Sequence, residues 1–148
     1  MLDFDPTESA GFLVARTAHA LSLRVQEFLD EAEIDMSAQE VSILTALAHL
    51  PEPKRMKSFA EKLGRDATTI SRQISKLEEE RLVRRSPCPE DGRSTVVAIT
   101  PKGAKLVEST IPLTLALRRR AMKGISKADA ETLARALSQM ITNLEADD

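Results

Sequence analysis

The chain has 148 residues and 42% hydrophobic content, which is enough to fill the core of one domain. It has no Trp or Tyr and only four Phe, and a core of aliphatic side chains favours packed helices over a β-sandwich. The net charge of −2 argues against a uniformly basic nucleic-acid binder, and no apolar run reaches the roughly 20 residues of a membrane span.

Two helices are predicted in the first third of the chain. Residues 8–33 form one long helix, because apolar side chains recur there at alternating steps of four and three, the spacing of a seam between helices. Residues 36–50 form the second, which starts at a capping box of Ser37 and Glu40 and ends before Pro51-Glu52-Pro53. The seam of the first helix consists of Val14, Ala18, Leu21, Val25, Phe28 and Ala32.

Two more helices are predicted in the centre of the chain. Residues 57–63 suit a short helix that ends at Gly64. Asp66 can cap the next helix, which covers residues 67–80. The buried face of that helix is marked by Ile70, Ile74 and Leu77.

A β-hairpin follows these helices. Residues 82–86 and 94–99 are two short runs, and in the second Thr95, Val97 and Ile99 alternate with the residues between them, as in a strand. The connection Pro87-Cys88-Pro89-Glu90-Asp91-Gly92 is rich in turn residues, so the two strands are expected to pair.

Two helices complete the chain. The first begins at Thr100-Pro101, with proline at its first helical position, and ends at Gly124; a kink is expected at Pro112. Ser126 and Asp129 cap the last helix. Its apolar stripe consists of Leu133, Leu137, Met140, Ile141 and Leu144.

This order of elements predicts a mainly α protein with a winged helix-turn-helix. One domain covers residues 1–148, with the winged helix-turn-helix in residues 36–100. Residues 8–33 and 101–146 lie outside it, yet both carry apolar seams that need a partner surface. A second copy of the chain would supply one, so these helices are expected to form the dimerisation region of a homodimer.

The charge distribution and the helix at residues 67–80 point to DNA. Residues 53–105 carry 13 basic and 7 acidic side chains, whereas residues 1–52 carry 2 basic and 10 acidic ones. The exposed face of the helix is small, polar and basic, so it can approach base edges and phosphates, although an ordinary amphipathic surface helix has the same pattern. The candidate DNA contacts on this helix are Thr68, Thr69, Ser71, Arg72, Gln73, Ser75 and Lys76.

The hairpin adds basic residues that suit a minor groove. Arg84 and Arg85 lie on its first strand, and Arg93 stands at its tip. A narrow minor groove concentrates negative potential and attracts arginine. Asp91 is expected to hold the Arg93 guanidinium by charge-assisted hydrogen bonds and to aim it, although an Asp-Gly pair also occurs in ordinary solvated turns.

Together these pieces resemble a known family. The run LGRDATTISRQISKLEEERLVRRSPCPEDGRSTVVAITPKGAKL, residues 63–106, is similar to the central signature of the MarR family of bacterial regulators. The matching pieces are TTISRQISKLE, ERLVRR, the Asp91-Gly92-Arg93 turn, and the T-x-x-G start at Thr100 and Gly103. Their order and spacing carry the resemblance, and the helices on both sides extend it over nearly the whole chain.

The resemblance implies a sequence-specific regulator of transcription that binds double-stranded DNA as a homodimer. Its recognition helices would enter successive major grooves of a pseudo-palindromic operator, and its wing arginines the flanking minor grooves. Many members of the family are repressors that release DNA when a small aromatic or lipophilic ligand, or an oxidant, reaches the region between the dimerisation and DNA-binding parts. The residues that would border such an effector cavity here are Arg16, His19 and His49.

Other classes of function find little support. An exposed Cys88 close to the wing arginines could be reactive, but an incidental thiol is the favoured interpretation. The first helix has neither Cys nor Trp as in oxidant- and urate-responsive members. The two histidines and one cysteine lack the spacing of a zinc site, and no nucleophile elbow, phosphate loop or dinucleotide fingerprint is present. We therefore expect a cytoplasmic protein that is not an enzyme and has no cofactor or membrane contact; a helical protein–protein adaptor is the alternative.

Overall fold

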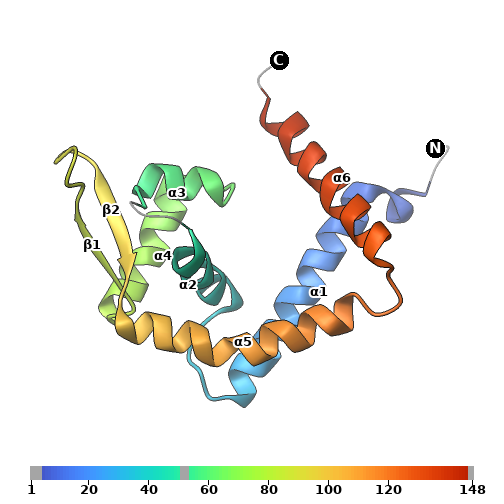
Figure 1. Ribbon diagram of the computed structural model, residues 1–148, viewed down its shortest axis with the longest axis horizontal. Coiled ribbons are helices and arrows are strands. Elements are labelled where there is room, and N and C mark those ends of the chain that lie inside the picture. Colours follow the sequence, from blue (N-terminus) through green and yellow to red (C-terminus); the bar gives the residue numbers. More distant parts are fainter. Residues whose placement is uncertain (1–4, 51–53, 147–148) are drawn as a thin grey trace. The chain divides into compact units, whose positions relative to one another are not determined.

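The computed structural model describes residues 5–50 and 54–146 and has the predicted order of helices and strands (Figure 1). One short 3-10 helix, η1, precedes the elements that the sequence predicted. Pro51 and Pro53, which predicted the end of the second helix, lie outside the described residues. The elements are η1 Pro6–Glu8, α1 Ala10–Glu31, α2 Ala38–His49, α3 Met56–Lys62, α4 Ala67–Glu79, β1 Val83–Pro87, β2 Thr95–Ile99, α5 Pro101–Ala121 and α6 Lys127–Glu145.

Four of the α-helices that the structure describes begin at a side chain that caps the first turn. The Ser9 hydroxyl accepts the Phe12 N–H, so α1 begins at Ala10 and not at residue 8 as the sequence predicted. Ser37 and Glu40 form the predicted capping box of α2, and Asp66 and Ser126 cap α4 and α6 as predicted. These oxygens satisfy backbone N–H groups that have no partner inside the helix.

Two compact units make up the chain, Met1–Leu113 and Thr114–Asp148. The division falls inside α5, between Leu113 and Thr114, one residue after Pro112. Proline lacks an N–H, so Pro112 cannot make the backbone hydrogen bond of a normal helical residue, yet α5 continues through it to Ala121.

The first unit has a continuous hydrophobic core. The predicted buried residues of α4, Ile70, Ile74 and Leu77, are at most 1% exposed. Leu29 on α1 is fully buried, although the sequence did not place it in the seam, whereas Val14 of the seam is 41% exposed. The other fully buried large side chains of this core are Ile43, Leu44, Leu47, Val83 and Val97.

The hairpin lies beside α3 and α4 (Figure 1), and an isolated β-bridge joins it to the residue before α3. β1 and β2 pair antiparallel with Arg85 opposite Val97. The Val97 N–H donates to the Lys54 carbonyl over 2.9 Å, and Arg55 forms an isolated bridge with Val96. The sequence did not predict this bridge, because two residues give no alternating pattern. It fixes the start of α3 against the wing.

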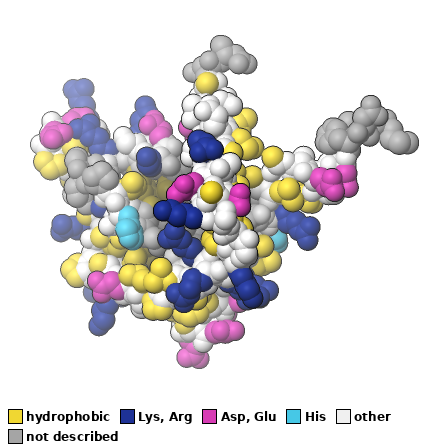
Figure 2. Space-filling view, turned by 45° about the vertical axis from the view of Figure 1, so that its right-hand side comes forward, with side chains coloured by type: hydrophobic (Ala, Val, Ile, Leu, Met, Phe, Trp, Pro, Cys, Tyr) yellow, Lys and Arg dark blue, Asp and Glu magenta, His cyan; other side chains and the backbone are white. Residues whose placement is uncertain are grey.

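The second unit contains the end of α5 and all of α6. None of the residues of α6 that the structure describes is buried, and Leu133, Ile141 and Leu144 are 48%, 55% and 83% exposed. Hydrophobic side chains therefore reach the surface among charged ones, as Figure 2 shows. A search of the described residues finds no helix long and apolar enough to cross a membrane.

Candidate nucleic-acid interface

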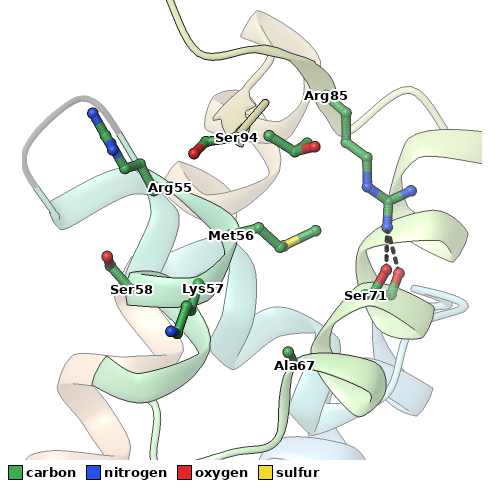
Figure 3. Close-up of a pocket in the computed structure, with 9 residues that line it drawn as sticks. Arg55, Met56, Lys57, Ser58, Ala67, Ser71, Arg85 and Ser94 are labelled. Carbon is green, nitrogen blue, oxygen red and sulfur yellow. Dashed lines mark hydrogen bonds between the residues drawn. The ribbon is translucent and has the colours of Figure 1, made fainter. Parts of the chain in front are cut away.

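A hollow of about 510 Å³ separates α3 and the start of α4 from the wing (Figure 3). Three of its lining residues are cationic, four carry a hydroxyl, and none is acidic. These cations and hydroxyls suit an anionic ligand such as a phosphate group, while Arg55 and Arg85 also pair with Glu90 and Glu78, which do not line the hollow. The lining residues are Arg55, Met56, Lys57, Ser58, Ala67, Ser71, Arg85, Ser94 and Thr95.

The outermost face of α4 presents Thr68 and Arg72. Both are exposed, and Arg72 makes no ion pair with any residue that the structure describes. Thr69 is also exposed, but its hydroxyl donates to the Asp66 carboxylate over 2.6 Å, and its N–H donates to the same group. These hydrogen bonds hold the pKa of Asp66 below its ordinary value. Thr69 therefore serves the helix cap, and Arg72 is the available cation.

The side of α4 that faces the wing differs from the sequence prediction. Ser71 and Ser75 were expected to face DNA, but Arg85 of β1 donates to the Ser75 hydroxyl over 2.9 Å and to the Ser71 hydroxyl over 3.1 Å. Arg85 Nη2 also donates to the Ser71 carbonyl. Glu78 accepts from the same guanidinium over 3.2 Å. The two serines are half-buried contacts between helix and wing.

The opposite side of α4 packs against α2, where two more of the predicted DNA contacts have partners within the protein. Lys76 forms an ion pair with Glu40 at 2.8 Å instead of standing free for bases or phosphates. The Gln73 amide donates to Gln39 over 2.9 Å and accepts from Arg65 over 3.4 Å. Both α4 side chains therefore bind residues of α2, although the Lys76 side chain is 55% exposed.

Glu40 is the buried partner in this ion pair, with 5% of its surface exposed. Burial alone would raise the pKa of Glu40, but hydrogen bonds from Lys76 and Ser37 outweigh burial, so the pKa lies below its ordinary value. The same carboxylate raises the pKa of Lys76. Glu40 thus caps α2 and holds α4 at the same time.

The wing tip corrects the role predicted for Asp91. Its carboxylate accepts the Arg93 backbone N–H over 3.1 Å and the Ser94 hydroxyl over 2.8 Å, and it makes no contact with the Arg93 guanidinium. Bonds from Ser94 and Arg93, with the charge of Arg55, hold the pKa of Asp91 below its ordinary value. Asp91 therefore shapes the turn, and the exposed Arg93 side chain is not aimed by it.

One more ion pair holds the wing. Arg55, the residue before α3, forms an ion pair with Glu90 at 2.9 Å and so joins the wing tip to the helix-turn-helix. Arg84 is exposed on β1, as predicted. The sequence prediction missed Arg55 and Lys57 as parts of the site, although the basic run Lys54-Arg55-Met56-Lys57 before a short helix was a usable signal.

Cys88 and the proposed effector residues take no part in this surface. Cys88 is 2% exposed, which argues against the reactive, exposed thiol considered as the less favoured alternative. His49 hydrogen-bonds through Nδ1 to the Thr45 carbonyl over 2.8 Å, within its own helix. Arg16 and His19 are exposed on α1. Among the described residues, no three His, Cys, Asp or Glu side chains are grouped so as to hold a metal ion.

Comparison with known proteins identifies related regulators of transcription. The model of the MarR family matches residues 36–95. The HTH-type transcriptional regulator YxaD of Bacillus subtilis is 31% identical over 120 residues, which are 80% of this chain and 84% of that protein. The HTH-type transcriptional repressor IacR of Pseudomonas putida is 37% identical over 78 residues, 53% of this chain; the chain spans only 47% of that repressor.

Solved structures show the same fold. The structure of BpsR from Bordetella bronchiseptica superposes on this chain with a TM-score of 0.81. The DNA binding of BpsR is regulated by 6-hydroxynicotinic acid. The two sequences are 22% identical, and the superposition covers 99% of this chain and all of the BpsR chain. At that identity the likeness establishes the fold alone.

Proposed function

The chain belongs to the MarR family, and from this premise we propose that it is a repressor of transcription that binds double-stranded DNA sequence-specifically. The observation that carries the proposal is the hollow between α3, α4 and the wing, with its cations and hydroxyls and without a carboxylate. It lies beside an α4 face that presents Arg72 to solvent. No acidic side chain lines the hollow, so it suits the DNA backbone although the chain as a whole carries a net charge of −2.

In this proposal α4 enters the major groove. Arg72 donates a pair of hydrogen bonds to guanine, and Thr68 contacts a neighbouring base or phosphate. Arg84 and Arg93 on the wing reach the minor groove, where the potential favours arginine. The hollow takes the backbone phosphates between the two grooves.

The proposed active form is a homodimer on a pseudo-palindromic operator. Apolar side chains of α1, α5 and α6 are exposed in the single chain, and a second copy would cover them. Two copies of α4 would then face two half-sites about one helical turn apart.

We further propose that a small aromatic or lipophilic ligand controls DNA binding. The comparison with BpsR, whose DNA binding 6-hydroxynicotinic acid regulates, supports the ligand class. Arg16, His19 and His49 stay the proposed effector residues on α1 and α2. A regulator that acts on the chromosome works in the cytoplasm, and its task is binding and release of DNA, without catalysis.

The test is selection of duplexes from random DNA, followed by affinity measurements at several salt concentrations. Each phosphate that a cation neutralises adds roughly −0.9 to the slope of log K against log salt. Arg72→Ala should weaken binding by about 1–3 kcal/mol per half-site and relax base preference there. Arg24→Ala is the matched control, because Arg24 is an exposed arginine of α1 paired with Glu27. Recovery of no preferred duplex, or equal affinity of the two variants, would contradict the proposal.

A further inference from the structure

Arg85 joins the wing to the recognition helix through both its backbone and its side chain. We propose that Arg85 is a positioning residue that fixes the angle of the wing relative to α4, so that Arg93 and Arg72 meet adjacent grooves of one duplex. The inference rests on the proposed DNA-binding function and assigns within it a role that the sequence did not predict.

The contacts of Arg85 form a closed set on α4. Its backbone N–H donates to Glu78 Oε1 over 2.9 Å, and its Nη1 donates to Glu78 Oε2 over 3.2 Å. Nη1 also reaches the Ser75 hydroxyl, and Nη2 reaches the hydroxyl and the carbonyl of Ser71 (Figure 3). The Ser75 hydroxyl in turn donates to the Ser71 carbonyl over 3.0 Å. A planar guanidinium can serve acceptors one helical turn apart at once, whereas the single ammonium of lysine cannot.

Burial strengthens this set of bonds. The Arg85 side chain is 23% exposed, and Glu78 is 39% exposed, so water competes less than at a fully exposed ion pair. The hydroxyls and carbonyl that Arg85 bonds are themselves half-buried. Moving the strand away from α4 would leave these acceptors with fewer partners, so the bonds oppose that reorientation.

The neighbouring residue shows that position, and not charge alone, makes the difference. Arg84 and Arg85 are adjacent on β1, so their side chains leave opposite faces of the strand. Arg84 is exposed and forms no ion pair with any described residue, whereas Arg85 is held against α4. One arginine is thus available for DNA, and the other binds the strand that carries it.

The effect of this anchor should appear at the wing tip. Arg93 lies at the far end of the hairpin from the strand residues that contact α4, and its side chain is exposed. The Arg55–Glu90 pair restrains the tip, and the Arg85 bonds restrain the strand. If the strand anchor is lost, Arg93 must be ordered at the moment of binding, which costs entropy and reduces its contribution.

The experiment is a double-mutant cycle on the duplex that selection recovers with the wild-type chain. The dissociation constant is measured for Arg93→Ala in three backgrounds: wild type, Arg85→Lys and Arg84→Lys, each corrected for its active fraction by stoichiometric titration. We expect Arg93→Ala to raise Kd on the order of tenfold in the wild type and in Arg84→Lys. In Arg85→Lys the same change should raise Kd by about threefold or less. All three backgrounds keep the same formal charge, so electrostatics alone predicts no difference.

A merely structural role of Arg85 would lower the folded fraction and leave the Arg93 factor unchanged, which would overturn the inference. An Arg93 factor near one in the wild type would overturn it as well, because the position of the wing would then have no consequence. If Arg85→Lys does not fold, Ser75→Ala, which removes one acceptor of Arg85 together with the bond from Ser75 to the Ser71 carbonyl, should reduce the Arg93 factor in the same direction. An unchanged factor there also overturns the inference. Failure of the wild type to select any duplex would instead refute the proposed function itself.

Discussion

Gly103 has no side chain, and this allows the start of α5 to pack directly against the end of the wing. A Cβ atom at this position would overlap the carbonyl oxygen of Leu82 and lie 2.8 Å from Cγ1 of Ile99. The Thr100 hydroxyl fixes the same corner, because it donates to Leu82 and accepts the Gly103 N–H. The sequence pattern T-x-x-G at the start of α5 therefore has a packing reason: the helix backbone touches the end of the wing.

We expect Gly103→Ala to lower the free energy of unfolding by about 1–3 kcal/mol, because the overlapping atom is backbone and cannot rotate away. The measurement is denaturant unfolding at fixed protein concentration. Gly92→Ala is the control, since no atom lies within 4 Å of a Cβ built there. A Gly103→Ala variant as stable as this control would show that the corner yields without cost.

At the scale of elements, α2 and α4 are joined by a polar contact that depends on pH. Glu40 accepts from Ser37 at the start of its own helix and from Lys76 on α4. Since the pKa of Glu40 is lower in the folded protein than its ordinary value of 4.5, ionised Glu40 favours the folded state. This contribution is complete above pH 4.5 and is lost as the pH falls through the lowered folded-state pKa.

Glu40→Gln should therefore destabilise the protein by about 1 kcal/mol at pH 7, the order expected for a partly exposed ion pair. The difference from wild type should shrink as the pH falls below about 4.5, where the carboxylate of the wild type becomes protonated too. Denaturant midpoints across this pH range measure it. Glu79→Gln, on the exposed face of the same helix α4, should change stability by less than about 0.5 kcal/mol at every pH. A difference for Glu40→Gln that does not vary with pH would contradict the assignment.

At the scale of the whole molecule, the exposed apolar side chains are the dominant feature. A single chain leaves many large hydrophobic residues partly open to water, on three helices that the sequence predicted as dimerisation elements. Such surface is costly in an isolated soluble chain and is normally covered by a partner. These residues include Phe12, Leu13, Val14, Leu21, Leu23, Ile111, Leu115, Leu133, Ile141 and Leu144.

We expect the wild-type chain to have the mass of a dimer at micromolar concentration in sedimentation equilibrium. Leu133→Glu should shift it toward monomer, because burial of a leucine contributes about 1.5–3 kcal/mol and a symmetric interface contains the change twice. Thr132→Glu introduces the same charge one residue off the apolar stripe and should leave the mass unchanged. A wild-type monomer at this concentration would disprove the assembly.

The sequence by itself determined the order and type of the elements, because these depend on local rules. Capping residues, apolar periodicity and turn residues act within a few positions of one another, and Ser37, Asp66 and Ser126 each cap the helix that was expected. The buried face of α4 also followed from its period alone. The exposed face of Thr68 and Arg72 followed for the same reason.

Only the tertiary structure decided which polar residues of that face are free. A helical projection of α4 shows only the residues of α4 itself. Arg85 of β1 binds Ser71 and Ser75, and Glu40 of α2 binds Lys76. Asp91 was wrongly assigned for a related reason, since a carboxylate two residues from an arginine can accept its backbone N–H as well as its side chain. Contacts between residues far apart in sequence depend on how the elements pack, and the local sequence pattern of a single element does not specify that packing.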